Sequence, residues 1–236
     1  MDDRFTLPAS QRKRSSPTAP YPIPLHNWSK QDEKLKRLRH LTPDDTQFRC
    51  LADIGCADAT LTAYIAWKLN IDKVYAADIY PETKFRQPNL NVDLFGEKNS
   101  ISPIDYVQEN HGLLNIPSNS VDLVICLMSI HHFQDRVVTL QEITRIMKPG
   151  GYLFIREHDV DPNNDKLRKK IDDIHIQFTS GERKEYITYD ITGHYMTMDY
   201  LRDQLERLNM EFIGYNKYPP PNPQEVYHAM YQLRQE

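Results

Sequence analysis

The sequence predicts an α/β protein whose doubly wound, mostly parallel seven-stranded sheet ends in an antiparallel strand pair. Short apolar runs alternate with helical patterns over residues 50–155, as is typical of parallel strands whose connecting helices cover both faces of a sheet. The last two apolar runs are joined by a short Pro-rich segment at residues 219–223. That connection is too short for a helical crossover, so the final two strands should be antiparallel.

Each expected element follows from its local pattern. Buried strands are expected where short apolar runs end at a polar residue or glycine: residues 50–54, 74–77, 106–107, 121–127 and 152–155. Helices are expected where apolar residues recur every three or four positions, or where a charged segment follows a capping residue: residues 28–41, 58–70, 137–147, 163–178 and 197–208. The closing strands are expected at residues 211–215 and 226–233.

Composition excludes several classes of protein. The chain has 236 residues, a net charge of -4 and 39% apolar residues, which fits a globular protein with a sizeable core. It has three cysteines, and their spacing matches no zinc pattern, so we assign no metal ligand. No apolar run is long enough for a membrane span or a signal core, so we expect no membrane partner and a reducing, cytoplasmic location.

Charge is distributed unevenly along the chain. Residues 1–40 hold nine Lys/Arg and four Asp/Glu, whereas the remaining residues hold twenty Lys/Arg and twenty-nine Asp/Glu. Within this basic head, residues 1–27 are Pro-rich and predict a disordered tail, because proline excludes regular helix and cannot donate to a sheet. A basic segment attracts phosphate or acidic surfaces, so we expect residues 1–40 to contact nucleic acid or an acidic partner.

Small and acidic residues follow the first two strands. The loop Asp53-Ile54-Gly55-Cys56-Ala57-Asp58-Ala59 lets the backbone approach a ligand at the start of a helix. It is neither the dinucleotide fingerprint nor a phosphate-binding P-loop, since the required glycines and the Gly-Lys-Ser/Thr are absent. Asp78 closes the second strand, where a carboxylate typically accepts both hydroxyls of a ribose.

These residues resemble the Asp-x-Gly-x-Gly-x-Gly motif of the class I S-adenosylmethionine-dependent methyltransferases, in their type 11/25-like form. The likeness extends to the block at residues 121–133, with Met128-Ser129-Ile130-His131-His132-Phe133, and to the block at 142–153, with Lys148-Pro149-Gly150-Gly151. It covers about residues 50–160. It implies a Rossmann-like fold, S-adenosyl-L-methionine as cofactor and a methyl acceptor as partner.

The resemblance also implies site residues. Asp53 and Gly55 should lie at the methionine end of the cofactor and Asp78 on the ribose. The family's adenine-side acid after the third strand has no obvious counterpart, and the candidates are Glu109, Asn110 and His111, of which Asn110 can satisfy an adenine amino group as an aspartate would. The implied cofactor-binding set is Asp53, Gly55, Cys56, Ala57, Asp78, Ile79, Asn110, Leu127, Met128 and Ser129. Ala57 and Ala59 depart from the family's glycines and resist positive φ, which predicts a differently shaped loop or weaker cofactor binding.

Candidate catalytic residues follow the fourth and fifth strands. Glu157, His158 and His131 are candidate bases or acceptor contacts, because methyl transfer needs a base only when the acceptor is protonated. The run Arg156-Glu157-His158-Asp159 holds four ionisable residues directly after a buried strand, so we expect it at the exposed edge where substrate enters. Alternatively, His131 only begins the next helix, and the run at 156–159 is a surface ion-pair cluster.

The domain division follows from these expectations. Residues 28–236 form a single methyltransferase domain, with a leading helix at 28–41, a cofactor-binding core at 50–160, helices that include a substrate lid at 161–210, and the closing strand pair at 211–236. Three functions remain open for it: a methyltransferase for a small molecule, a methyltransferase for RNA, and a catalytically degenerate domain that binds a cofactor or partner. The basic residues 1–40 favour RNA as the methyl acceptor. The net negative charge of residues 41–236 and the resemblance of the blocks at 121–133 and 142–153 favour a small-molecule acceptor.

Overall fold

The structure, a computed structural model, describes residues 28–57, 59–79, 103–179 and 193–235. It contains a seven-stranded sheet in the order β3-β2-β1-β4-β5-β7-β6. The strands are β1 (Cys50–Ile54), β2 (Lys73–Asp78), β3 (Ile104–Gln108), β4 (Val121–Leu127), β5 (Met147–His158), β6 (Met210–Lys217) and β7 (Val226–Leu233). β1 to β5 are parallel, whereas β7 pairs antiparallel with both β5 and β6. The expected doubly wound sheet with an antiparallel closing pair is therefore confirmed.

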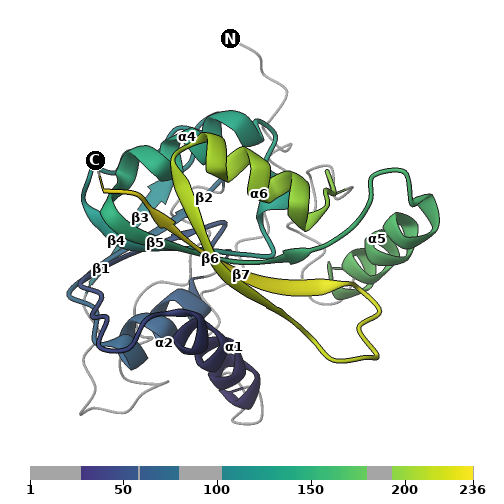
Figure 1. Ribbon diagram of the computed structural model, residues 1–236, viewed down its shortest axis with the longest axis horizontal. Coiled ribbons are helices and arrows are strands. Elements are labelled where there is room, and N and C mark those ends of the chain that lie inside the picture. Colours follow the sequence, from purple (N-terminus) through teal and green to yellow (C-terminus); the bar gives the residue numbers. More distant parts are fainter. Residues whose placement is uncertain (1–27, 58, 80–102, 180–192, 236) are drawn as a thin grey trace, which may run out of the picture.

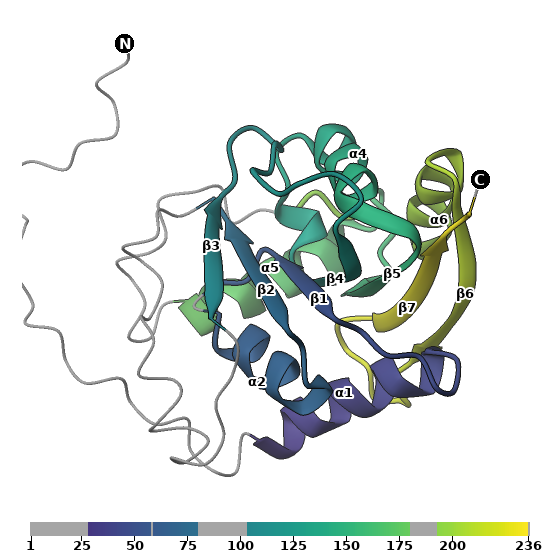
Figure 2. The same cartoon turned by 90° about the vertical axis from the view of Figure 1, so that its left-hand side faces the viewer.

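Helices cover both faces of this sheet. Figures 1 and 2 show α1 and α2 on one face and α4 and α6 on the other, while α5 lies beyond the end of β5. Their bounds are α1 (Trp28–Leu41), α2 (Thr60–Leu69), α4 (Arg136–Ile146), α5 (Asp165–Thr179) and α6 (Met198–Arg207). The described helices are all too short or too polar to span a bilayer. The expected tail at residues 1–27 lies outside the described residues.

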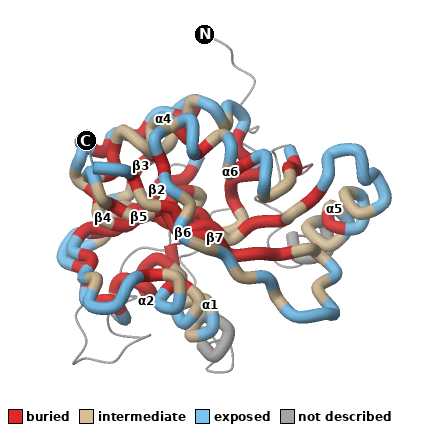
Figure 3. Tube along the Cα trace, viewed as in Figure 1, coloured by how far each residue is buried: buried red, intermediate tan, exposed pale blue. Residues whose placement is uncertain are grey.

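Two apolar layers hold the helices to the sheet. Alternate strand residues point to opposite faces, so Leu51 packs toward the α1 and α2 layer while Ala52 packs toward the α4 and α6 layer. The central strands are almost completely buried, as the red segments of Figure 3 show. Because both faces are covered, these strands read in the sequence as nearly continuous apolar runs.

α6 belongs to the core. Its Leu201 and Leu205 are fully buried in the same apolar cluster as Tyr231 of β7. Thr197 caps the helix by accepting a hydrogen bond from the backbone amide of Tyr200. α6 is therefore not part of a lid, and the predicted lid at 161–210 is limited to α5 and the residues next to it. Residues 180–192 lie outside the described part of the chain.

β5 extends further than the sequence indicated. The expected strand ended at Ile155, with residues 156–159 at an exposed edge, but the ladder with β7 continues to His158 opposite Val226. Glu157 and His158 are each 1% exposed, so the expected exposed position is wrong for both. Pairing with β7 removes water from them, and a hydrogen bond with the His131 ring at 2.6 Å compensates the burial of Glu157.

Asp122 joins three strands at the amino-terminal edge of the sheet. Its carboxylate accepts hydrogen bonds from the backbone amides of Arg49 and Cys50, at 3.0 and 2.8 Å, just before and at the start of β1. The other oxygen accepts from the Lys148 ammonium in β5 at 2.7 Å. Hydrogen bonds to charged groups are stronger than neutral ones, so this side chain holds β1, β4 and β5 together.

Asp122→Ala should lower the free energy of unfolding by about 2 kcal/mol, because two backbone amides and one ammonium lose their acceptor. Urea denaturation monitored by circular dichroism measures the loss. Asp122→Asn is the matched control: it keeps an acceptor for the amides and should cost less. Equal stability of all three proteins would show that the tie between the strands contributes nothing.

Candidate functional site

Two loops meet at the carboxyl-terminal edge of the sheet, where the loops after β1 and β4 touch. The Ser129 hydroxyl donates a hydrogen bond to the carbonyl of Ile54 at 2.8 Å. A Cβ built on Gly55 would lie 2.3 Å from the Cβ of Ser129, and Gly55 has φ +79°. Only glycine fits both the left-handed backbone and this close approach. In open α/β sheets, ligands bind at this edge.

Asp53 places a buried carboxyl group beneath this contact. It is 3% exposed, and its Oδ2 accepts a hydrogen bond from the Thr62 hydroxyl at 2.6 Å. Its Oδ1 is buried and has no hydrogen-bond partner in the part of the chain that the structure describes. Burial is the main cause that raises the pKa of Asp53 to about 7, with a smaller contribution from the Asp78 carboxylate. A cation placed against Oδ1 would satisfy this oxygen and reverse the shift.

The loop after Gly55 contains left-handed residues although two of them are alanines. Ala57 and Ala59 have φ of 51° and 56°, so both adopt the positive φ that alanine was expected to resist, while a different loop shape or weaker cofactor binding stays a prediction. The left-handed region costs a non-glycine residue roughly 1–2 kcal/mol. The Asp78 carboxylate at the end of β2 helps to hold this conformation, because it accepts a hydrogen bond from the Ala57 amide at 2.8 Å.

The other residues of the expected cofactor set lie around the same edge. Cys56 is buried, whereas Ile79 is an exposed apolar side chain directly after β2. Asn110 is exposed after β3, in a two-residue turn closed by its backbone hydrogen bonds with Leu113. Leu127 and Met128 are half-buried at the end of β4. The structure thus gathers the whole set at one edge, and their individual roles stay predictions.

The three candidate catalytic residues lie together. His131 sits in the 3-10 turn η4 (Ile130–His132), two residues after Ser129, and its Nδ1 lies 2.6 Å from the Glu157 carboxylate. That carboxylate also accepts from the backbone amides of His131 and His158. Burial alone would raise the pKa of Glu157, but the His131 ring and these hydrogen bonds lower it below its ordinary value. Glu157 is therefore a carboxylate that orients His131.

His158 completes the cluster from the opposite side. Its Nδ1 lies 2.7 Å from the backbone carbonyl of Gln224, in the connection between β6 and β7. A carbonyl can only accept, so Nδ1 of His158 carries the proton. Burial lowers the pKa of His158 to about 4, so the ring is neutral near pH 7. The Nε2 atoms of His131 and His158 are both buried, and neither has a hydrogen-bond partner among the described residues.

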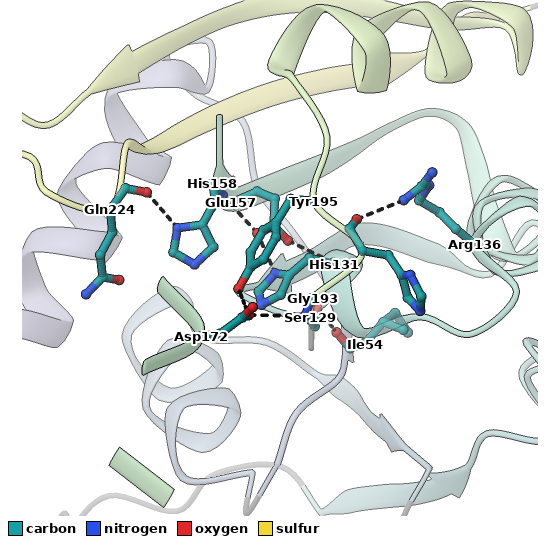
Figure 4. Close-up of polar contacts among 11 residues, drawn as sticks. Ile54, Ser129, His131, Arg136, Glu157, His158, Asp172, Gly193, Tyr195 and Gln224 are labelled. Atoms are coloured by element: carbon teal, nitrogen blue, oxygen red, sulfur yellow. Dashed lines mark hydrogen bonds and ion pairs between the residues drawn. The ribbon is translucent and has the colours of Figure 1, made fainter. Parts of the chain in front are cut away.

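Two further residues join this cluster. Sequence reasoning missed His175, whereas it placed Tyr195 in an aromatic stretch that forms either a lid over the acceptor or an ordinary packed loop. His175 of α5 stacks on His131 with ring centroids 5.2 Å apart, and Tyr195 stacks on the same ring at 5.4 Å. The Tyr195 hydroxyl donates to Asp172 of α5 at 2.7 Å (Figure 4). His175 lies within a charged helical segment, where no local spacing distinguishes it. Tyr195 stands beside His194 in an aromatic stretch, but Tyr186 and Tyr189 of that stretch lie outside the described residues.

Comparison with known proteins finds a family match for part of the chain and solved structures with the same fold. Residues 52–155 match the family described as "Methyltransferase domain". Solved structures share the fold: a SAM-dependent methyltransferase from Methanosarcina mazei is 20% identical, with a TM-score of 0.56, and covers 84% of this chain and 97% of its own. A SAM-dependent methyltransferase from Aquifex aeolicus is 13% identical, with a TM-score of 0.54, and covers 87% and 97%. The match over residues 52–155 and the shared fold support a class I S-adenosylmethionine-dependent methyltransferase.

Curated relatives of this chain match only in part. The ubiquinone/menaquinone biosynthesis C-methyltransferase UbiE of Shewanella halifaxensis is 24% identical over 128 residues, which is 50% of each chain. The protein of the same name from Pseudoalteromonas translucida is 36% identical over 72 residues, 30% of this chain and 28% of its own. The chain thus spans half or less of the length of these relatives, and their activity is not carried over by that likeness.

The strand-end residues fit S-adenosylmethionine. The unpartnered Oδ1 of Asp53 matches the cofactor's ammonium group, since a buried carboxylate oxygen needs a donor or cation. Gly55 packs directly against Ser129, which brings the loops after β1 and β4 together at this edge. Ile79 offers an apolar surface next to Asp78, which suits a planar base beside a ribose.

Gly55→Ala should abolish S-adenosylmethionine binding and lower stability by about 2–4 kcal/mol, because the added methyl group combines left-handed strain with overpacking against Ser129. Isothermal titration calorimetry and thermal denaturation measure the two effects. The control in the same loop is Ala57→Gly, an exposed position. It should keep cofactor binding and raise stability by about 1 kcal/mol, since glycine relieves the left-handed backbone. Unchanged affinity in Gly55→Ala would contradict the placement of the cofactor.

Proposed function

We propose that this methyltransferase transfers the methyl group of S-adenosylmethionine to a small molecule bound beside His131, Glu157 and His158. The observation that carries the proposal is the buried polar cluster at the carboxyl ends of β4 and β5, two residues along the chain from the Ser129 contact with the β1 loop. Acceptor and cofactor then occupy adjacent places at one edge of the sheet. This arrangement argues against the degenerate alternative.

The cofactor site is proposed as follows. Asp53 binds the ammonium group of the methionine moiety, and Gly55, Cys56 and Ala57 form the loop against it. Asp78 binds the ribose hydroxyls while also holding the Ala57 amide. The remaining contacts are assigned to Ile79 and Asn110 on the adenine side and to Leu127, Met128 and Ser129 between cofactor and acceptor.

The chemistry asks mainly for alignment. A sulfonium methyl group moves in line to a nucleophile, so holding the two reactants at close range provides most of the acceleration. The cluster supplies polar contacts in a dry site, where electrostatic interactions are stronger than in water. His131, oriented by Glu157, and His158 act on the nucleophilic atom of the acceptor. Tyr195 and α5 cover the cluster and exclude water.

A small molecule fits this site better than RNA. The acceptor side is lined by buried rings and a carboxylate, whereas phosphate recognition needs an exposed basic surface. Arg37 in the basic helix α1 is engaged within the chain: it pairs with Glu33, donates to Asn216, and lies 4.1 Å above the Tyr218 ring. The curated relatives are named for quinone biosynthesis, which is small-molecule chemistry. The predicted contact of residues 1–40 with nucleic acid or an acidic partner stays a prediction.

Affinity for S-adenosylmethionine should rise with pH from about pH 6 to about pH 8. The folded-state pKa of Asp53 is raised to about 7, so the free protein holds a proton there at lower pH, and the cofactor ammonium must displace it. Below that pKa the affinity should fall by up to about tenfold per pH unit. Calorimetry across this range measures the effect. Asp53→Asn should bind more weakly and lose the pH dependence, whereas Asp122→Asn at the opposite edge should keep it; an unchanged profile in Asp53→Asn would contradict the role.

The proposed function is tested by methyl transfer from labelled cofactor into separated metabolite, RNA and protein pools. We expect label in the metabolite pool, and loss of that label in Asp78→Ala, which should bind the cofactor weakly. Deleting residues 1–27 should leave small-molecule transfer unchanged. Label in RNA that depends on those residues and on low salt would establish the RNA alternative, and cofactor binding without transfer to any pool would favour the degenerate one.

A further inference from the structure

The buried histidine cluster has a property that methyl transfer alone does not require. One ring nitrogen each of His131, His158 and His175 lies within 4.8 Å of the other two. The three residues come from η4, β5 and α5, so the fold brings them together from separate parts of the chain. His131 and His158 are each 1% exposed, and their unpartnered Nε2 atoms carry the desolvation cost of a buried polar group without compensation.

The outer hydrogen bonds of the cluster match those of metal-binding histidines. A ligating histidine typically donates its second ring N–H to a carboxylate or a backbone carbonyl, which fixes the tautomer and orients the ring. His131 has this arrangement with Glu157 at 2.6 Å, and His158 has it with the Gln224 carbonyl at 2.7 Å. Both bonds use Nδ1 and leave Nε2 as a lone-pair donor.

We propose that His131, His158 and His175 bind one divalent transition-metal ion, with Zn²⁺ as the ion best suited to them. Three neutral imidazoles suit zinc and its first-row neighbours and do not suit the hard ions Mg²⁺ and Ca²⁺. Zinc bound through Zn–N bonds of about 2.1 Å places tetrahedral ligand atoms roughly 3.4 Å apart. The observed limit of 4.8 Å therefore requires inward side-chain movements of about 1 Å, which the half-buried His175 on α5 can provide.

Three protein ligands leave the fourth position of a tetrahedral ion open, as in catalytic zinc sites. This part of the inference rests on the proposed function: a hydroxyl, thiol or amine of the acceptor takes the open position and loses its proton to water. Its lone pair then forms the bond to the methyl carbon as the carbon–sulfur bond breaks. The products are the methylated acceptor and S-adenosylhomocysteine.

Metal binding is tested directly on the full chain, without any acceptor. Chelator-treated protein is titrated with Co²⁺, followed by Zn²⁺ competition and measurement of bound metal after dialysis. We expect one ion per chain, visible absorption bands typical of tetrahedral Co²⁺, and displacement of Co²⁺ by Zn²⁺. Absence of the bands together with no zinc retained after dialysis would overturn the proposal.

Variants locate the site. Glu157→Gln should keep one ion per chain but weaken its affinity by about 10–100-fold, because the residue orients a ligand without touching the metal. His175→Ala, at a half-buried helix position, should weaken binding more strongly, and circular dichroism verifies its fold. The matched control is His40→Ala, an exposed histidine of α1, which should bind as wild type. Wild-type affinity in folded His175→Ala would overturn the assignment.

The same samples separate this inference from the proposed function. Cofactor affinity of the metal-free protein reports on the S-adenosylmethionine site alone, since no metal ligand belongs to the β1 loop. Stoichiometric zinc without methyl transfer would refute the proposed function and keep the metal site. Full methyl transfer by chelated, zinc-free protein would refute the metal's part in acceptor activation, and an absence of zinc binding would refute the site itself.

Discussion

The close approach of Gly55 to Ser129 is the constraint on which the rest of the site depends. It joins the ends of β1 and β4, and the Ser129 hydroxyl locks it through the Ile54 carbonyl. Because η4 begins directly after Ser129, the same contact sets where His131 enters the acceptor side. A shift of one loop would therefore displace both halves of the site together. Because of this coupling, position 55 requires glycine. At positions 57 and 59 the loop accepts alanine, at a moderate cost in backbone strain.

Burial of charge is the second organising feature. Glu157 is 1% exposed, and a carboxylate in such a place is stable only when paired and hydrogen-bonded. Its carboxylate accepts hydrogen bonds from the His131 ring and from the backbone amides of His131 and His158, so both of its oxygens have partners. The antiparallel strand β7 makes this burial possible, because it pairs with β5 as far as His158 and covers the strand end that would otherwise face water. The closing strand pair is thus part of the site as well as of the fold.

The sequence predicted the fold well because its signals are local. Apolar runs ending at polar residues located β1, β2 and β4, and the short Pro-rich connection established the antiparallel pair. The site was predicted less completely, because its geometry depends on contacts between distant segments. An ionisable run such as Arg156-Glu157-His158 looks exposed until β7 is placed beside it. His175 and the Gln224 carbonyl reach the cluster from α5 and from a loop, and neither leaves a pattern in its own segment.

The two edges of the sheet differ in how well their polar groups are satisfied. At the amino-terminal edge, both carboxylate oxygens of Asp122 have partners. At the carboxyl-terminal edge, Asp53, His131 and His158 hold unpartnered buried atoms, and left-handed alanines add strain. Local rules of stability are typically broken where a protein functions, and a ligand that binds only the folded state offsets the cost. The unsatisfied atoms form two groups: an oxygen that needs a cation from the cofactor, and ring nitrogens that need a metal or an acceptor. The cofactor can satisfy the Asp53 oxygen, and a metal ion or the acceptor can satisfy the ring nitrogens of His131 and His158. The free protein is therefore less stable at the two positions where these ligands are proposed to bind.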